Sequence, residues 1–108
     1  MKLYIAVLDE FPDYMTPTLV AHAVLGAHLW FEGDSVWNNW LYGDFKKCVV
    51  RVNQKEFDKI KELGAVYLAH ENTTLEGRKA CAVVRPYADD KDIPNVLKFA
   101  RLWSPKNE

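Results

Sequence analysis

The sequence predicts an α/β fold in which helices cover both faces of one mixed sheet. Apolar, β-branched segments alternate with segments of helical periodicity, in the order β-α-β-α-β-β-α. Four strands are expected, which makes a three-layer, four-stranded mixed sheet whose last two strands are antiparallel because no helix separates them. The chain has 108 residues, enough for one hydrophobic core, so residues 1–108 should form a single domain.

The first strand and the following helix have the clearest patterns. Residues 2–8 are a nearly continuous apolar run, which is typical of a strand buried on both faces. Thr16 and Pro17 are residue types that favour a helix N-cap and first helical position. Apolar residues then recur at helical spacing, so a helix of about four turns is expected to end near Phe31.

An aromatic segment, residues 36–45, comes next and is expected to form a short helix or lid. Its rings Trp37, Trp40 and Tyr42 are predicted to cap one end of the small core. Two alternatives stay open. The same rings are able to stack on nucleic-acid bases, or to form a patch through which copies of the chain associate.

The second half continues the alternation. Residues 48–52 read as a strand, and Asn53 with Glu56 has the spacing of a capping box that opens a helix ending at Gly64. Strands are expected at 65–69 and 79–85. A last helix is predicted from about Pro94 to Trp103, because apolar residues share one face there.

The charge distribution limits the function. Residues 1–45 hold a single basic side chain, Lys2, and have a net charge of −5, whereas residues 46–108 have a net charge of +4. Non-specific binding to nucleic acid depends on neutralising phosphates, so only the second half is expected to offer a basic patch.

Location and metal content are predicted from what the sequence lacks. The longest uncharged run, residues 14–31, contains His22 and His28 and is expected to be an amphipathic helix, not a membrane span. No signal peptide is expected. Cys48 and Cys81 lack partners at metal-ligand spacing, so we expect reduced thiols, a cytoplasmic protein, and neither metal nor other cofactor.

Two loops after predicted strands carry the candidate chemistry, residues 9–16 and 70–77. The second contains a carboxylate, an amide and two hydroxyls, which are the groups that orient water and stabilise the oxyanion in ester hydrolysis. It also reads as a solvated connection. Other candidates have two interpretations each. His22 is catalytic or packed in the core, Asp9 is a site carboxylate or a turn residue, and Lys46 and Lys47 contact phosphate or are simply solvated.

The order of motifs resembles the peptidyl-tRNA hydrolase 2 family. In residues 18–27, TLVAHAVLGA, the positions His22, Ala23, Leu25 and Gly26 match the family's H-A-x-L-G. The segment from Trp40 to Val52 resembles its W-x-x-x-G-x-x-K-V-V-x-V stretch. A polar loop with threonines and the pair Gly77-Arg78 follow in the family's order, so the resemblance covers nearly the whole chain.

The resemblance implies metal-independent hydrolysis of the ester between a peptide and the 3′ end of tRNA, on a four-stranded mixed sheet. Carried over by position, His22 matches the family's histidine, Glu71 lies near its aspartate, and Thr73 or Thr74 matches its threonine. From these matches and from the candidate residues above, we assign the catalytic and substrate-binding residues. Catalytic residues are His22, Glu71, Thr73 and Thr74, and substrate-binding residues are Asp9, Lys46, Lys47, Asn72 and Arg78.

The family's loop lysine has no counterpart here, since Met15 or Thr16 stands in its place, and Leu19 replaces its glutamine. Residues 9–18 contain no Lys or Arg, which lowers the attraction of this loop for phosphate. The alternative is therefore a non-catalytic member that binds a nucleotide, a peptide or a protein in the same cleft. Expected partners are tRNA or a nucleotide, with no membrane, and the protein is expected as a monomer or homodimer.

Overall fold

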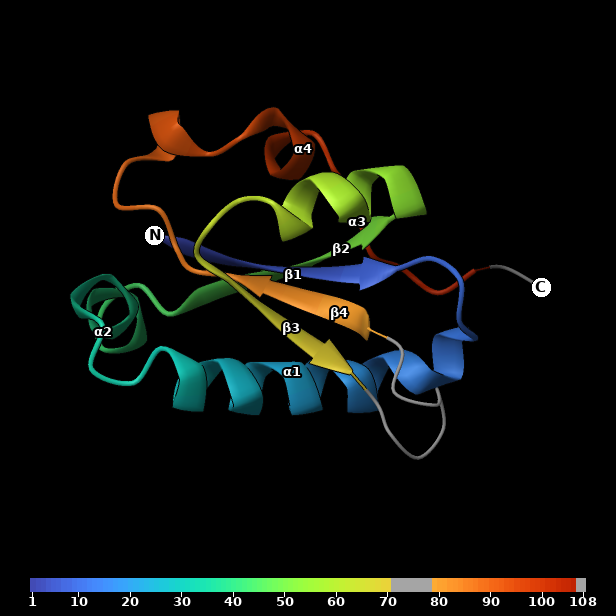
Figure 1. Ribbon diagram of the computed structural model, residues 1–108, viewed down its shortest axis with the longest axis horizontal. Helices are drawn as coiled ribbons and strands as arrows, with labels where there is room; N and C mark the ends of the chain where they lie inside the picture. Colours follow the sequence, from blue (N-terminus) through green and yellow to red (C-terminus); the bar gives the residue numbers. More distant parts are fainter. Residues whose placement is uncertain (71–78, 107–108) are drawn as a thin grey trace.

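The computed structural model of the protein describes residues 1–70 and 79–106, which form a mixed sheet with helices on both faces (Figure 1). The described strands run side by side in the order β3-β4-β1-β2-β5. Neighbours β1 and β2 are parallel, whereas β4 is antiparallel to both β1 and β3, and β5 is antiparallel to β2. The strands are β1 (Lys2–Leu8), β2 (Lys46–Val52), β3 (Val66–His70), β4 (Lys79–Val84) and β5 (Arg101–Leu102).

Helix α1 packs on one face of the sheet, and α3 with α4 packs on the other (Figure 1). The short helix α2 closes one end of the α1 layer. Helices and 3₁₀ turns are η1 (Asp13–Met15), α1 (Thr16–Trp30), α2 (Ser35–Leu41), α3 (Gln54–Lys61), η2 (Asp90–Asp92) and α4 (Asn95–Lys98). No helix in the described ranges is long and apolar enough to cross a membrane.

Local sequence signals explain where the two main helices begin. The predicted capping box is confirmed: the Asn53 side chain accepts a hydrogen bond from the Glu56 backbone, and the Glu56 carboxylate accepts one from the Asn53 backbone. Gly64 follows α3 with a φ of +85°, which suits glycine. Thr16 is the first residue of α1 and not its N-cap, because the 3₁₀ turn η1 leads straight into the helix.

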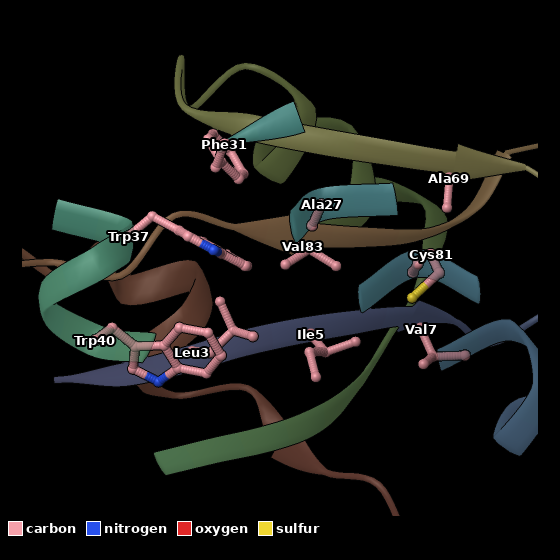
Figure 2. Close-up of a cluster of buried hydrophobic side chains, with 11 residues drawn as sticks. Leu3, Ile5, Val7, Ala27, Phe31, Trp37, Trp40, Ala69, Cys81 and Val83 are labelled. Carbon is pink, nitrogen blue, oxygen red and sulfur yellow. The ribbon is translucent and has the colours of Figure 1, made fainter. Parts of the chain in front are cut away.

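The strand β1 is buried on both faces, as its continuous apolar run predicts. Leu3, Ile5 and Val7 face α1 and belong to the cluster shown in Figure 2. The alternate residues, including Tyr4 and Ala6, face α3 and α4. This central strand therefore divides the core into two halves, one under each helical layer.

The aromatic segment caps the α1-side core, as predicted for two of its three rings. Trp37 and Trp40 are 0% and 1% exposed, and Figure 2 shows Trp40 beside Leu3 at the start of β1. The prediction is wrong for Tyr42, which is 84% exposed. Tyr42 lies just after α2 ends, so its side chain is no longer on the buried side of that helix.

The predicted last helix is wrong beyond Lys98, and within residues 1–70 and 79–106 the sheet has five strands instead of the four predicted. Arg101 and Leu102 form β5 on the free edge of β2, where Leu102 is opposite Val50. The Trp103 backbone also donates to the Val49 carbonyl at 2.8 Å. Apolar residues at 99, 100, 102 and 103 suit a helix or a strand, and the unpaired edge of β2 decides in favour of the strand.

Candidate functional site

The C-terminal ends of strands β1, β2 and β3 and the start of helix α1 lie together at one end of the sheet, which we call the carboxyl edge. The parallel strands β1 and β2 both end there, and β3 ends there too because it is antiparallel to β4, which is antiparallel to β1. Helix α1 begins at this edge and runs back along the sheet (Figure 1). Ligands of α/β proteins favour the carboxyl ends of parallel strands.

His22 lies beside the last residues of β3. Helix α1 and strand β3 are in contact at Gly26, because a Cβ atom at this position would overlap the Tyr67 hydroxyl. His22 is one turn, about 6 Å, before Gly26 on the same stripe of the helix. Ala69 is about 7 Å beyond Tyr67 on a strand that runs in the opposite direction. The exposed His22 is therefore level with the end of β3.

The predicted catalytic loop starts directly after this point. Glu71, Asn72, Thr73, Thr74 and Arg78 all lie outside the described residues. What the structure places is the two ends of that loop: β3 ends at His70 and β4 begins at Lys79, both at the carboxyl edge. The assignment of these five residues to the site stays a prediction.

A group of four charged residues, which we call the Arg51 cluster, occupies the same edge near the start of α1. It comprises Arg51, Asp9, Asp13 and Lys106. The Arg51 side chain is 5% exposed, and its Nη1 donates to Asp9 Oδ1 at 2.9 Å and to Asp13 Oδ1 at 3.0 Å. Its Nη2 donates to Asp13 Oδ2 at 3.2 Å and to the carbonyl of Ser104. Lys106 Nζ binds Asp9 at 2.9 Å.

The cluster holds both aspartates in the ionised form. The hydrogen bond from Lys106, with a further one from Arg51, lowers the pKa of Asp9. Hydrogen bonds from Arg51, followed by one from the Lys106 backbone, lower the pKa of Asp13. Two acids and two bases leave the cluster without net charge. Asp9, a predicted substrate-binding residue, is thus held in an ion pair with residues from β2 and the C-terminal segment.

Sequence reasoning missed Arg51, although a signal was present. Arg51 is the charged residue inside the apolar strand 48–52, and a charge buried in a strand needs an opposite charge nearby. The acids of the 9–16 loop supply it. The structure also buries Met15 and Thr16, the residues at the position of the family's loop lysine, so neither presents a polar group to solvent here.

Lys46 and Lys47 lie far from His22, at the opposite edge where β1 and β2 begin, and they face opposite sides of the sheet. Lys46 lines a cavity of about 520 Å³, which we call the lysine cavity. Tyr4 and Ile93 form its apolar wall. Its charged lining consists of Lys2, Lys46, Lys91, Lys98, Asp90 and Met1, whose terminal ammonium is bound by Asp44. The structure thus separates the predicted residues Lys46 and Lys47 from the predicted residue His22.

Comparison of the sequence with models of known protein families and with curated proteins finds no match. The resemblance to peptidyl-tRNA hydrolases therefore rests on the motifs quoted above. Within residues 1–70 and 79–106, no three His, Cys, Asp or Glu side chains come together in a way that could hold a metal ion.

Proposed function

We propose that this protein is an ester hydrolase of the peptidyl-tRNA hydrolase 2 type, with its site at the carboxyl edge beside His22. One observation carries the proposal: an exposed imidazole on α1 is level with the end of β3, one residue before the loop that contains Glu71 and the two threonines. Neutralisation of Asp9 and Asp13 by Arg51 and Lys106 supports it, because the acidic loop then repels RNA less than its sequence suggests.

The proposed chemistry needs only residues of this chain and water. Glu71 or His22 accepts a proton from a water molecule while the water oxygen attacks the ester carbonyl carbon. The hydroxyl of Thr73 or Thr74 donates a hydrogen bond to the oxyanion that forms. The bond to the 3′ ribose oxygen then breaks, and this leaving oxygen takes up the proton, which yields free peptide and tRNA.

The test is release of a labelled N-blocked amino acid from tRNA by the purified protein in excess over substrate. We expect cleavage above the buffer rate, and a loss of about 10²–10⁴-fold in His22→Ala and Glu71→Ala, the range that a general acid or base contributes. Leu29→Ala serves as the matched control, because Leu29 is an exposed residue on the same helix at its other end.

Two results would reject this function. One is wild-type cleavage that equals the buffer rate with intact substrate and folded protein. The other is cleavage that persists in both His22→Ala and Glu71→Ala, since an esterase activity elsewhere on the surface would behave in this way.

The lysine cavity favours a second candidate, the binding of a nucleotide without hydrolysis. Four lysines from β1, β2, η2 and α4 line about 520 Å³ next to the apolar wall of Tyr4 and Ile93. Such a site suits phosphates together with a base. The cavity lies at the edge away from His22, so this ligand would not share the cleft that the sequence predicts.

Titration with ATP tests this candidate. Binding should weaken in Lys2→Gln and Lys98→Gln and should fall steeply as salt rises. It should be unchanged in Lys55→Gln, because Lys55 is exposed on α3 outside the cavity. Equal weakening by all three substitutions would show non-specific attraction and would reject the site.

A further inference from the structure

A pocket that the proposed hydrolysis does not use lies at the other end of α1, between α1, α2 and the start of β2. We call it the aromatic pocket, and we propose that it binds a small planar aromatic carboxylate. Its volume is about 450 Å³, which is in the range of small-molecule sites. It is lined by Val24, Leu25, His28, Trp37, Trp40, Leu41, Tyr42, Phe45 and Lys47.

A series of aromatic rings, tilted against one another, forms the floor and one side of the pocket. The ring centroids of Trp37 and Trp40 are 4.9 Å apart, and Phe45 lies 5.2 Å beyond Trp40. The two indoles are fully buried, whereas Phe45 is half exposed. The series of rings therefore begins in the core and ends at the surface, where a flat apolar group can continue it.

Phe45, at the rim of the pocket, has a backbone conformation that is energetically unfavourable for a bulky residue. Phe45 has a φ of +54°, in the left-handed region that bulky residues avoid. Its backbone donates to the Trp40 carbonyl at 3.0 Å, and the Trp40 indole donates to the Lys46 carbonyl at 2.7 Å. Residues kept in such conformations cluster at ligand sites, where they preform the geometry.

Two polar groups give the pocket its expected selectivity. The Trp37 indole donates to His28 Nδ1 at 3.2 Å, so Nδ1 is an acceptor and Nε2 is the nitrogen whose N–H can donate to a ligand. Lys47 supplies the cation. Its Nζ lies 3.1 Å from the Phe45 ring centroid, and in the described part of the chain no carboxylate pairs with it.

His28 and Lys47 together match a ligand group that carries a single negative charge and accepts hydrogen bonds. A carboxylate can pair with Lys47 and accept from His28 while its ring lies against Phe45, at the surface end of the series of rings. A phosphate group usually gathers more donors than one ammonium and one imidazole. An uncharged side chain from a second copy would leave Lys47 without a partner, so the aromatic acid fits the whole lining better.

The experiment is a titration of ¹⁵N-labelled protein with indole-3-acetate, followed through the indole N–H signals of the four tryptophans. The signals of Trp37 and Trp40 should shift, and that of Trp103, which lies beside Arg51 outside the pocket, should not. Neutral indole-3-acetamide should bind about tenfold more weakly, because it lacks the charge-assisted contact with Lys47.

Three variants locate the site. Lys47→Gln should reduce the affinity for the acid to that for the amide, whereas Lys46→Gln, which removes the same charge one residue away on the other face, should not. Val24→Phe should abolish binding by filling the pocket with a ring while keeping Lys47. The dispersion of each spectrum reports whether the variant is folded.

The inference is overturned if the indole signals do not respond, or if the acid and the amide bind equally well to the wild type. It is also overturned if the same signals shift with protein concentration alone, because a second copy would then cover the pocket. Hydrolysis of peptidyl-tRNA is independent of all these outcomes.

Discussion

The two ends of the parallel strand pair β1–β2 differ in how their charged side chains are buried and paired. At the carboxyl edge, Arg51 is buried and all its neighbours in the cluster are paired. At the amino edge, Lys46 and Lys47 are exposed, and each lines a pocket. The register pairs Lys2 with Lys46 and Leu8 with Val52, so the contrast develops along only seven residue pairs.

The difference shows which charges serve the fold and which are free for ligands. A buried ion needs its partners, so the Arg51 cluster is part of the structure. Exposed lysines without a carboxylate partner add little stability, so they can bind an anion without weakening the fold.

Arg51→Met should lower the free energy of unfolding by about 3 kcal/mol, since it leaves the carboxylates of Asp9 and Asp13 without their shared partner. Urea denaturation measures the change. Arg101→Met is the matched control: Arg101 is exposed and lies opposite Arg51 on β5, so it should cost less than about 0.5 kcal/mol. Equal losses would mean that the cluster is not what stabilises this edge.

Gly26→Leu should lower the free energy of unfolding by about 2 kcal/mol, because α1 cannot approach β3 when a side chain overlaps the Tyr67 ring. Tyr67→Ala in the same chain should recover part of this loss, which a double-mutant cycle in urea would detect. Strict additivity of the two substitutions would contradict the contact between Gly26 and Tyr67, and with it the placement of His22.

Low pH should reduce the stability that the Arg51 cluster provides at the carboxyl edge. The pKa values of Asp9 and Asp13 are lowered in the folded protein, so the unfolded chain binds more protons as the pH falls below about 4. The stabilisation is present above that pH and is lost as the pH falls through the folded pKa values. Unfolding experiments from neutral pH to about pH 3 should show a steeper loss for the wild type than for Arg51→Met. Parallel curves would contradict the assignment.

The smallest expected effect is a difference in the reactivity of the two cysteine thiols, which is measured without changing the stability of the protein. Burial raises the pKa of Cys81 to about 12, whereas Cys48 is half buried and its pKa is raised by desolvation. Iodoacetamide should therefore label Cys48 slowly in the native protein and Cys81 only after unfolding, as mass spectrometry of the peptides would show. Native labelling of Cys81 at the rate of Cys48 would contradict the packing of β4.

Features encoded by neighbouring residues could be predicted from the sequence. The two-sided burial of β1, the extent of α1 and the capping box of Asn53 and Glu56 each depend on a few adjacent positions. Local patterns also predicted that Trp37 and Trp40 cap the core.

Features that depend on distant partners could not be predicted. Arg51 meets Asp9 and Asp13 across 42 and 38 residues, and nothing near Arg51 indicates which acids it binds. The change from helix to strand at Arg101 depends on the free edge of β2, about 50 residues earlier in the chain. The candidate site stays a prediction. Residue types left two interpretations of His22 and of the loop, and the resemblance to the family favoured the functional one. The contact between helix and strand at Gly26 was needed to place His22 level with the end of β3.

The most direct test of the central proposal is a distance measurement between His22 and the 71–74 loop. A nitroxide attached at Thr73→Cys, with Cys48 and Cys81 replaced by alanine, should strongly broaden the amide signals around His22. It should leave those around Lys46, at the opposite edge, sharp. Sharp signals at His22 with broadening elsewhere would contradict a shared site, whatever activity the protein shows.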